Sequence, residues 1–315
     1  MLKNKADLRS VLFMVLAATT LVVLWNYGST MSLLLFIPLY VLQLQMAVTT
    51  SVMVHNHQHR GIWKSHWMNI FTDNFLTVFY GFPVFAWIPT HNTNHHVHVN
   101  KEEDYTKTYM KSEKNNLGTL LAYPYINGVT QQKAVIGYYW NLRKENPTKF
   151  ALHTLQLVSL VAWIAIALII DWKKALMYVV IPQQLSLFAV LIFNYIQHVH
   201  ADEETVYNSS RNITGWGMNF WLLNNGFHTV HHLSPHVHWS ELPARHRKIE
   251  HLIHPSLNEP TLFGYIFRNY FLGMFSEKYR TKSMRLARLA NQPYITGESQ
   301  MNEEKRKAEA AIAAS

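Results

Sequence analysis

Four long apolar runs without a charged side chain constrain the fold of this chain more than any other feature. They cover residues 11–25, 31–54, 151–170 and 175–196. Uncharged apolar runs that approach twenty residues are typical of helices that cross a bilayer. Only a few polar residues separate the first run from the second and the third from the fourth. The sequence therefore predicts four membrane spans arranged as two hairpins.

The distribution of basic residues orients these spans. The chain has 28 Lys and Arg and a net charge of +9, but the two hairpin turns contain only Lys173 and Lys174. The other basic residues lie in the N-terminus, in the 55–150 segment and in the C-terminal third, which four spans place on one side. The positive-inside rule makes that side the cytosol. The basic charge then reflects topology and anionic lipid head groups, and we do not expect a nucleic-acid partner.

The predicted fold class is an all-α integral membrane protein. Four transmembrane helices in two hairpins carry a cytosolic helical cap. Residues 1–275 are predicted to form a single membrane domain, and residues 276–315 a polar C-terminal tail. The aromatic segment 71–90 contains Gly81 and two prolines, which favours an interfacial or re-entrant element. Segments 117–129 and 262–275 have a similar interfacial character.

Histidine is unusually abundant and cysteine is absent. The chain has 19 His, as many as Asp and Glu combined, and no Cys. The absence of Cys excludes disulfides, thiolate zinc sites and iron–sulfur clusters. A metal must therefore be bound through nitrogen and oxygen ligands.

The histidines form clusters with helical spacing. The pairs i, i+4 are His55/His59, His91/His95, Asn194/His198 and His228/His232, and two further histidines adjoin them, His96 and His231. Residues four apart share one face of a helix. Span parity puts all the clusters on the same side of the membrane. Nine histidines are too many for one ion and fit two metal ions. All-imidazole sites with open positions favour iron, while zinc and manganese remain open by ligand type.

The order of these clusters resembles a known family. His55-x3-His59, His91-x3-His95-His96 and His228-x2-His231-His232 match the three histidine boxes of the membrane fatty acid desaturase superfamily, which includes related hydroxylases. The resemblance covers roughly residues 10–250. It implies O2-dependent oxidation of a fatty acyl chain, most directly desaturation, at a cytosolic di-iron centre. It also implies that the nine histidines are ligands and that Asn194 holds a metal-bound water beside His198.

The same resemblance implies an electron donor outside the chain. The sequence has no His-Pro-Gly-Gly motif of a fused cytochrome b5 module. We therefore expect a separate electron-transfer protein of the ferredoxin, rubredoxin or cytochrome b5 type, with a lipid acyl group as the substrate. The expected location is a bacterial inner membrane rather than the endoplasmic reticulum.

Several polar residues near the clusters are expected to support the ligands rather than bind metal. These are His57, His98, His238 and Asp202. His57 also competes with His55 as the ligand of the first cluster. Five other histidines are interpreted as surface or interface residues: His66, His153, His246, His251 and His254.

Other functions remain open at this point. A fatty acid, alkane or carotenoid hydroxylase, or an alkene-forming fatty acid decarboxylase, would use the same ligands. A catalytically inactive scaffold of the same fold would also keep the spans. The alternative from another class is a membrane metal transporter or sensor. A transporter needs ionisable ligands within its spans, and the four apolar runs contain no Asp, Glu, Lys or Arg.

Overall fold

The computed structural model describes residues 1–291 and 298–313, and it is mostly helical. The chain divides into two compact units. The first unit comprises Met1–Thr90 and Gln132–Val190, and the second comprises His91–Gln131 and the described residues from Leu191 onward. The helices of the first unit are α1 (Leu8–Tyr27), α2 (Leu33–His59), α3 (His66–Tyr80), α6 (Gln132–Glu145), α7 (Pro147–Ala175) and the first part of α8 (Ile181–His198).

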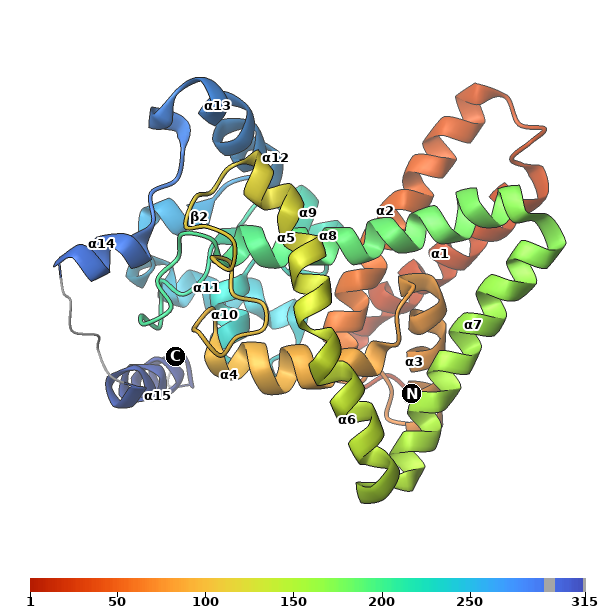
Figure 1. Cartoon of the computed structure of the whole chain (residues 1–315), viewed down its shortest axis with the longest axis horizontal. Helices are drawn as coiled ribbons and strands as arrows, with labels where there is room; N and C mark the ends of the chain where they lie inside the picture. The colour runs from red at the N-terminus through yellow and green to blue at the C-terminus, as the bar shows by residue number, and fades with distance from the viewer. Residues whose placement is uncertain (292–297, 314–315) are drawn as a thin grey trace. The chain divides into compact units, whose positions relative to one another are not determined.

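Among the described residues, three helices are long and apolar enough to cross a membrane. They are Lys5–Tyr27, Leu33–His59 and the 52-residue stretch Pro147–His198. The helices α1 and α2 pack side by side along the chain's first hairpin (Figure 1). Their outward positions are rich in exposed Leu, Val and Ile, which suits contact with lipid rather than water.

The long third stretch is interrupted within the turn expected between the last two apolar runs. Asp171 leaves the helical conformation, with φ −159° and ψ 100°. Its carboxylate Oδ1 accepts hydrogen bonds from the backbone N–H groups of Lys173 and Lys174, both at 3.1 Å. Asp171 thus caps the helical segment that follows it. The two-hairpin arrangement of four spans and the cytosolic cap remain predictions.

Polar side chains inside the first unit satisfy the backbone of neighbouring helices. Gln43 donates to the Tyr178 carbonyl at 2.7 Å, and Gln183 donates to the Val78 carbonyl at 2.7 Å. Such bonds are expected where water is excluded. A small pocket lies beside these two glutamines. Its other lining residues are mostly apolar and include Leu21, Met46 and Trp163.

Gly81 ends α3 and redirects the chain toward the second histidine cluster. Its φ is +85°, a left-handed conformation that residues with a Cβ rarely adopt. A Cβ at this position would also lie 2.5 Å from the Cβ of Gln183. The chain then forms a short 3-10 turn at Val84–Ala86 and a π-helical segment at Ile88–His95. Segment 71–90 is therefore a helix, a tight turn and the start of a second helical segment.

The second unit consists of short helices and one small sheet. Its elements are α4 (His96–His98), α5 (Leu117–Thr130), the end of α8, α9 (Trp216–Trp221), α10 (His228–Leu233), α11 (Leu242–Ile249), α12 (Leu262–Ile266), α13 (Gly273–Phe275), α14 (Met284–Asn291), α15 (Glu298–Ala313), β1 (Asn212–Ile213) and β2 (Asn258–Glu259). The strands β1 and β2 pair in parallel. The core of this unit includes Tyr123, Tyr195, Tyr265 and Tyr270.

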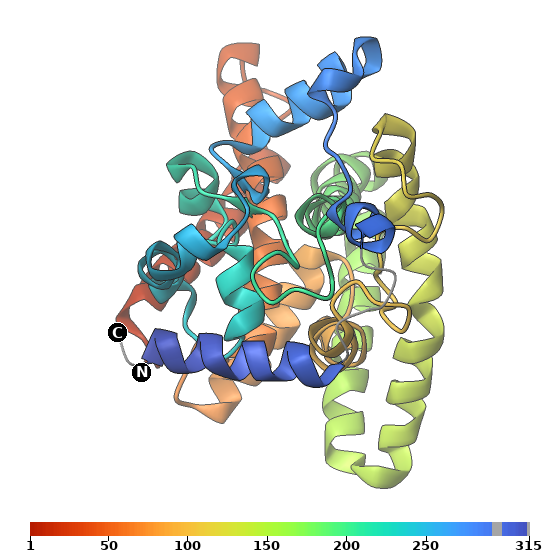
Figure 2. The same ribbon diagram turned by 90° about the vertical axis from the view of Figure 1, so that its left-hand side faces the viewer.

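Ion pairs and helix packing hold the C-terminal helices against the rest of the second unit. Arg288 on α14 is half-buried and binds two buried carboxylates, Asp202 at 2.7 Å and Glu203 at 2.9 Å. The helix α15 packs against α10 and α11 (Figure 2). Ala308 and Ile312, four residues apart, are buried on α15. The polar region after residue 276 therefore includes helices that contribute to packing.

His246 on α11 is buried, in contrast to the surface or interface position expected for it. Its side chain is 2% exposed and its ring lies 5.1 Å from that of Phe227. Neither ring nitrogen has a hydrogen-bond partner within the described part of the chain. Burial lowers the pKa of His246 below its ordinary value of 6.5, although Glu250 opposes this effect. Below that pH the unfolded chain binds more protons at this residue than the folded protein does, so stability falls as the pH falls.

We predict that His246→Phe stabilises the protein, and that it does so more at about pH 5.5 than at about pH 7.5. The change removes two unpartnered buried nitrogens, which each cost about 1–3 kcal/mol. The midpoint of thermal unfolding in detergent checks this at both pH values. His251→Phe, at an exposed position nearby, is the control. A pH dependence equal to that of the unchanged protein would contradict the assignment.

Candidate metal centre

The helix α10 presents three histidines from a fully buried turn. All six of its residues, from His228 to Leu233, are buried. A helix this short does not form by itself in water, so tertiary contacts must hold it. Thr229 provides them, because its backbone N–H donates to Asn212 Oδ1 at 3.0 Å and its Oγ1 accepts from Asn212 Nδ2 at 2.9 Å. Asn212 belongs to β1, so the small sheet fixes the position of α10.

Gly226 allows β1 to approach the start of this helix. The backbone N–H of Ile213 donates to the Gly226 carbonyl at 2.8 Å. A Cβ at position 226 would lie 2.1 Å from the Ile213 carbonyl oxygen, so no larger residue fits without a shift of the backbone. Asn219 completes the contact by accepting from the Gly226 N–H at 3.0 Å.

Four histidines of the second unit form a buried group that could hold a metal ion. One ring nitrogen from each lies within 4.8 Å of those of the others, and all four residues are buried: His95, His198, His228 and His232. The Nε2 atoms of His198 and His228 are 3.0 Å apart, and that of His232 lies 3.1 Å from each. Adjacent nitrogens bound to one ion at about 2.0–2.1 Å are separated by about 3 Å. The observed spacing fits such a site.

The protonation of two of these rings directs lone pairs into the group. His198 Nδ1 lies 2.9 Å from the Ser209 carbonyl oxygen, which can only accept, so Nδ1 carries the proton and Nε2 a lone pair. His95 Nδ1 lies 2.7 Å from an Asp104 carboxylate oxygen, so its Nε2 likewise carries a lone pair. The buried His95 Nε2 has no hydrogen-bond partner among the described residues. Lone pairs that converge in a buried space are suited to a cation.

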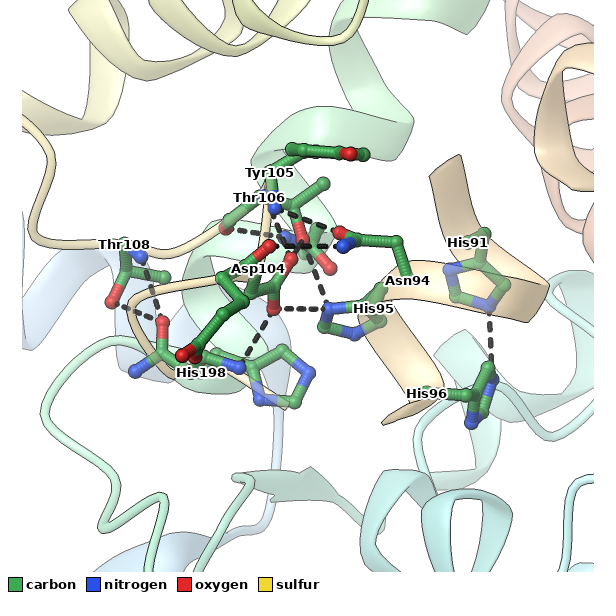
Figure 3. A network of polar contacts seen from close by, with 12 residues as sticks. His91, Asn94, His95, His96, Asp104, Tyr105, Thr106, Thr108 and His198 are labelled. Atoms are coloured by element: carbon green, nitrogen blue, oxygen red, sulfur yellow. Dashed lines mark hydrogen bonds and ion pairs between the residues drawn. The ribbon is translucent and has the colours of Figure 1, made fainter. Parts of the chain in front are cut away.

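Asp104 lies at the centre of the polar network behind His95 (Figure 3). Its carboxylate accepts from His95 Nδ1, from the Asn100 N–H and from the N–H and Oγ1 of Thr106, each at 2.7 Å. Burial by itself would raise the pKa of Asp104. The contact with His95 and the hydrogen bonds from Thr106 outweigh burial and hold that pKa at about 2. The carboxylate is therefore ionised and fixes both the orientation and the tautomer of His95.

The backbone next to this network adopts an unusual conformation that directs an N–H group toward Asp104. Val99 and Asn100 follow α4 in left-handed conformations, with φ 34° and 63°. Such values are rare for a β-branched residue such as Val99 and mark a constrained turn. The turn aims the Asn100 N–H at Asp104. Asn94 ties the turn to the preceding helix by donating to the Glu103 carbonyl at 2.9 Å and accepting from the Tyr105 N–H at 2.8 Å (Figure 3).

A second set of histidines in the same unit lies in a more accessible place. The Nε2 atom of His96 is 3.1 Å from those of His91 and His231. His91 and His96 are half-buried, whereas His231 is buried. The sequence pairs His91 with His95, but the structure places His91 with His96 and His95 with the buried group. The cause is the π-helical segment, whose wider turn brings residues i and i+5 together.

The first cluster lies on α2 in the first unit. The rings of His55 and His59 are 5.0 Å apart, and His55 stacks on Trp87 with 5.3 Å between ring centroids. His57 points elsewhere, because its Nδ1 accepts from the Ile62 N–H at 3.3 Å and its Nε2 lies 3.4 Å from Asp73. The structure thus gives His55 and His59 a shared helix face and gives His57 other contacts.

The remaining expected residues have varied surroundings. Asn194 donates to the Tyr123 hydroxyl at 2.6 Å and to the Thr106 carbonyl at 3.4 Å, which places its amide beside the loop that carries Asp104. His238 is buried and contacts Ser240 at 2.7 Å. Asp202 binds Arg288. His98 is partly exposed on α4.

Comparison with known proteins agrees with this geometry. The sequence profile of the family described as "Fatty acid desaturase" matches residues 29–259 of the 315, a region that contains all the histidine clusters. The chain therefore belongs to the fatty acid desaturase family. No individual curated protein matches it.

Family membership and the apolar helices together identify a membrane protein of the oxidoreductase class. The family assignment indicates fatty acyl oxidation, and the histidine groups fit a metal site. Burial, with the neighbouring imidazoles of His228 and His96, lowers the pKa of His232 well below its ordinary value. Its ring is therefore neutral and able to act as a ligand at physiological pH.

We predict that Asp104→Asn lowers metal affinity by roughly 10–100-fold, because the neutral amide no longer holds His95 in one tautomer. The measurement is metal retention against a competing chelator in the detergent-purified protein. Asp202→Asn is the matched control, since Asp202 is also a buried aspartate of the second unit but binds Arg288. Equal metal loss in both variants would show that the effect is a general loss of folding.

Proposed function

We propose that this protein catalyses O2-dependent oxidation of a fatty acyl chain, most directly the introduction of a double bond, at a centre of two iron ions. The observation that carries the proposal is the buried all-imidazole group of His95, His198, His228 and His232, in a chain of the desaturase family. Nitrogen ligands without any thiolate suit iron that reacts with oxygen. Two external electrons would come from a ferredoxin, a rubredoxin or a cytochrome b5.

The proposed ligands divide between two ions. The buried group would hold one ion. His91, His96 and His231 would contribute to the second, together with His55 and His59, whose inclusion rests on the order of the clusters in the sequence. Asn194 would act through a bound water. When bound, the two ions supply the redox chemistry that couples O2 reduction to the removal of hydrogen from an unactivated methylene group.

The protein's own residues would orient the metal ligands and exclude water from the site. Asp104 and the Ser209 carbonyl hold two imidazoles in the tautomer that can bind metal. Burial of α10 keeps water from the group it helps to form.

Orientation and location are part of the proposal. The basic residues outside the hairpin turns favour a cytosolic site. The proposed location is a bacterial inner membrane rather than the endoplasmic reticulum. A hydroxylase, an alkene-forming decarboxylase or an inactive scaffold would keep the same histidines, so product identity must decide among them. A metal transporter is the alternative without lipid chemistry.

The first test is the metal content of the protein purified in detergent from cells grown with iron-57. We expect about two irons per chain, coupled in the Mössbauer spectrum. A single zinc, or no tightly bound metal, would contradict the di-iron proposal. A change in cellular metal tolerance without any change in lipid composition would favour transport instead.

The second test removes one proposed ligand from each of the two ions. We predict that His232→Ala and His231→Ala each abolish acyl oxidation while the protein remains membrane-inserted, because each removes a ligand of a different ion. His251→Ala, at an exposed position, should retain full activity. Mass spectrometry of lipids from cells supplied with defined fatty acids is the measurement. Full activity in either ligand variant would overturn the assignment of that residue as a ligand. If the unchanged protein produced an alcohol or a terminal alkene, the proposed reaction would be hydroxylation or decarboxylation instead of desaturation.

A further inference from the structure

A row of exposed phenylalanines runs along one helical element of the second unit. Helix α12 continues through a π-helical segment, Phe267–Leu272, into α13. Every fourth residue is Phe, and these rings are 79%, 44%, 49% and 77% exposed in the order Phe263, Phe267, Phe271 and Phe275. Successive ring centroids lie 6.3, 5.1 and 5.8 Å apart. We call these four residues the phenylalanine row. It lies beyond residue 259, where the family match ends.

The opposite face of the same element is anchored in the core. Tyr265 and Tyr270 are 1% and 3% exposed. Asn115 donates to the Tyr265 hydroxyl at 3.0 Å and accepts from the Tyr270 hydroxyl at 2.7 Å. These contacts leave the element little freedom to rotate. The outward direction of the phenylalanine row is therefore fixed by the fold and is not a property of a loose segment.

A contiguous aromatic surface of this kind is costly in water. Soluble proteins rarely expose large contiguous apolar patches without a partner. Between Leu262 and Phe275 the only charged residue is Arg268. An element with one apolar face, one anchored face and almost no charge is suited to lie in the boundary between head groups and acyl chains. Phenylalanine is also typical of the apolar face of helices that lie in this boundary.

The charges that follow the row match an anionic lipid surface. Lys278, Arg280 and Lys282 come directly after α13 and are all exposed. Glu277 is the only acidic residue among them, and it pairs with Arg280 at 3.4 Å. Basic residues beside an apolar face add electrostatic attraction to anionic head groups. The chain also brings this unit to a membrane, because α8 belongs to a candidate span and ends in the second unit at His198.

We propose that the phenylalanine row is a lipid-binding surface by which the second unit inserts into the head-group region of the bilayer, in addition to its attachment through α8. This inference concerns attachment and does not rest on the reaction proposed above. The proposed partner is an apolar boundary layer that carries anionic head groups.

The absence of native cysteine permits a direct test. Phe263→Cys and Phe275→Cys in the full chain each receive one nitroxide label, and the protein is reconstituted in vesicles of phosphatidylcholine and phosphatidylglycerol. Lys248→Cys, exposed on α11, is the matched control. We expect the labels in the row to collide more with O2, which concentrates in lipid, than with a water-soluble nickel complex. The control should show the reverse order.

The other outcomes overturn the proposal. A preference for the nickel complex at both row positions, as at Lys248→Cys, would place the row in water. Spin–spin broadening that grows with the protein-to-lipid ratio would assign the row to contact with a second copy of the chain. If Phe263→Cys or Phe275→Cys differs from the unchanged protein in size-exclusion elution, Phe267→Cys takes the place of that variant. Replacing phosphatidylglycerol by phosphatidylcholine should reduce the depth of the labels in the bilayer. If the depth stayed the same, the basic residues would have no role in the attachment.

Discussion

Convergent imidazole lone pairs are the constraint on which the second unit depends. Hydrogen bonds to Asp104 and to the Ser209 carbonyl place protons on the outer nitrogens of His95 and His198 and leave lone pairs directed inward. Lone pairs in a buried space repel one another unless a cation lies between them. Most helices described in this unit are short and its described sheet has two strands, so these elements depend on tertiary contacts for their stability. Many of those contacts also hold the histidines in place. A bound metal would therefore contribute to folding as well as to chemistry.

The two histidine groups differ in their access to solvent. All four residues of the group around His198 are buried, whereas His91 and His96 are half-buried. A dry environment strengthens electrostatic interactions, and a more accessible one admits exchangeable molecules. Two ions in such places would have unlike affinities and unlike exchange rates. This asymmetry suits a centre in which one ion is held tightly and the other is open to small molecules.

The sequence was sufficient for some features because they repeat with a period. Uncharged apolar runs predicted the helices that can cross a membrane, and the order of the histidines predicted the family. Asp104 was not foreseen, because it lies in an acidic segment after Lys101 that resembles any solvated loop. Asp202 was expected near an imidazole, but Arg288, 86 residues away in sequence, binds it. Contacts made across long separations leave no local pattern, so the support of the site could not be predicted from spacing.

The π-helical segment has a consequence for how this chain tolerates insertions and deletions. A π turn contains about one residue more than an α turn. Here that extra residue puts His91 beside His96 and leaves His95 for the buried group. Loss of one residue between His91 and His95 would make His96 the fourth residue after His91, so an ordinary α turn would keep these two rings together. Insertion of one residue there would make His96 the sixth residue after His91, and neither an α turn nor a π turn brings such residues together. This segment is therefore expected to tolerate the loss of one residue better than the gain of one.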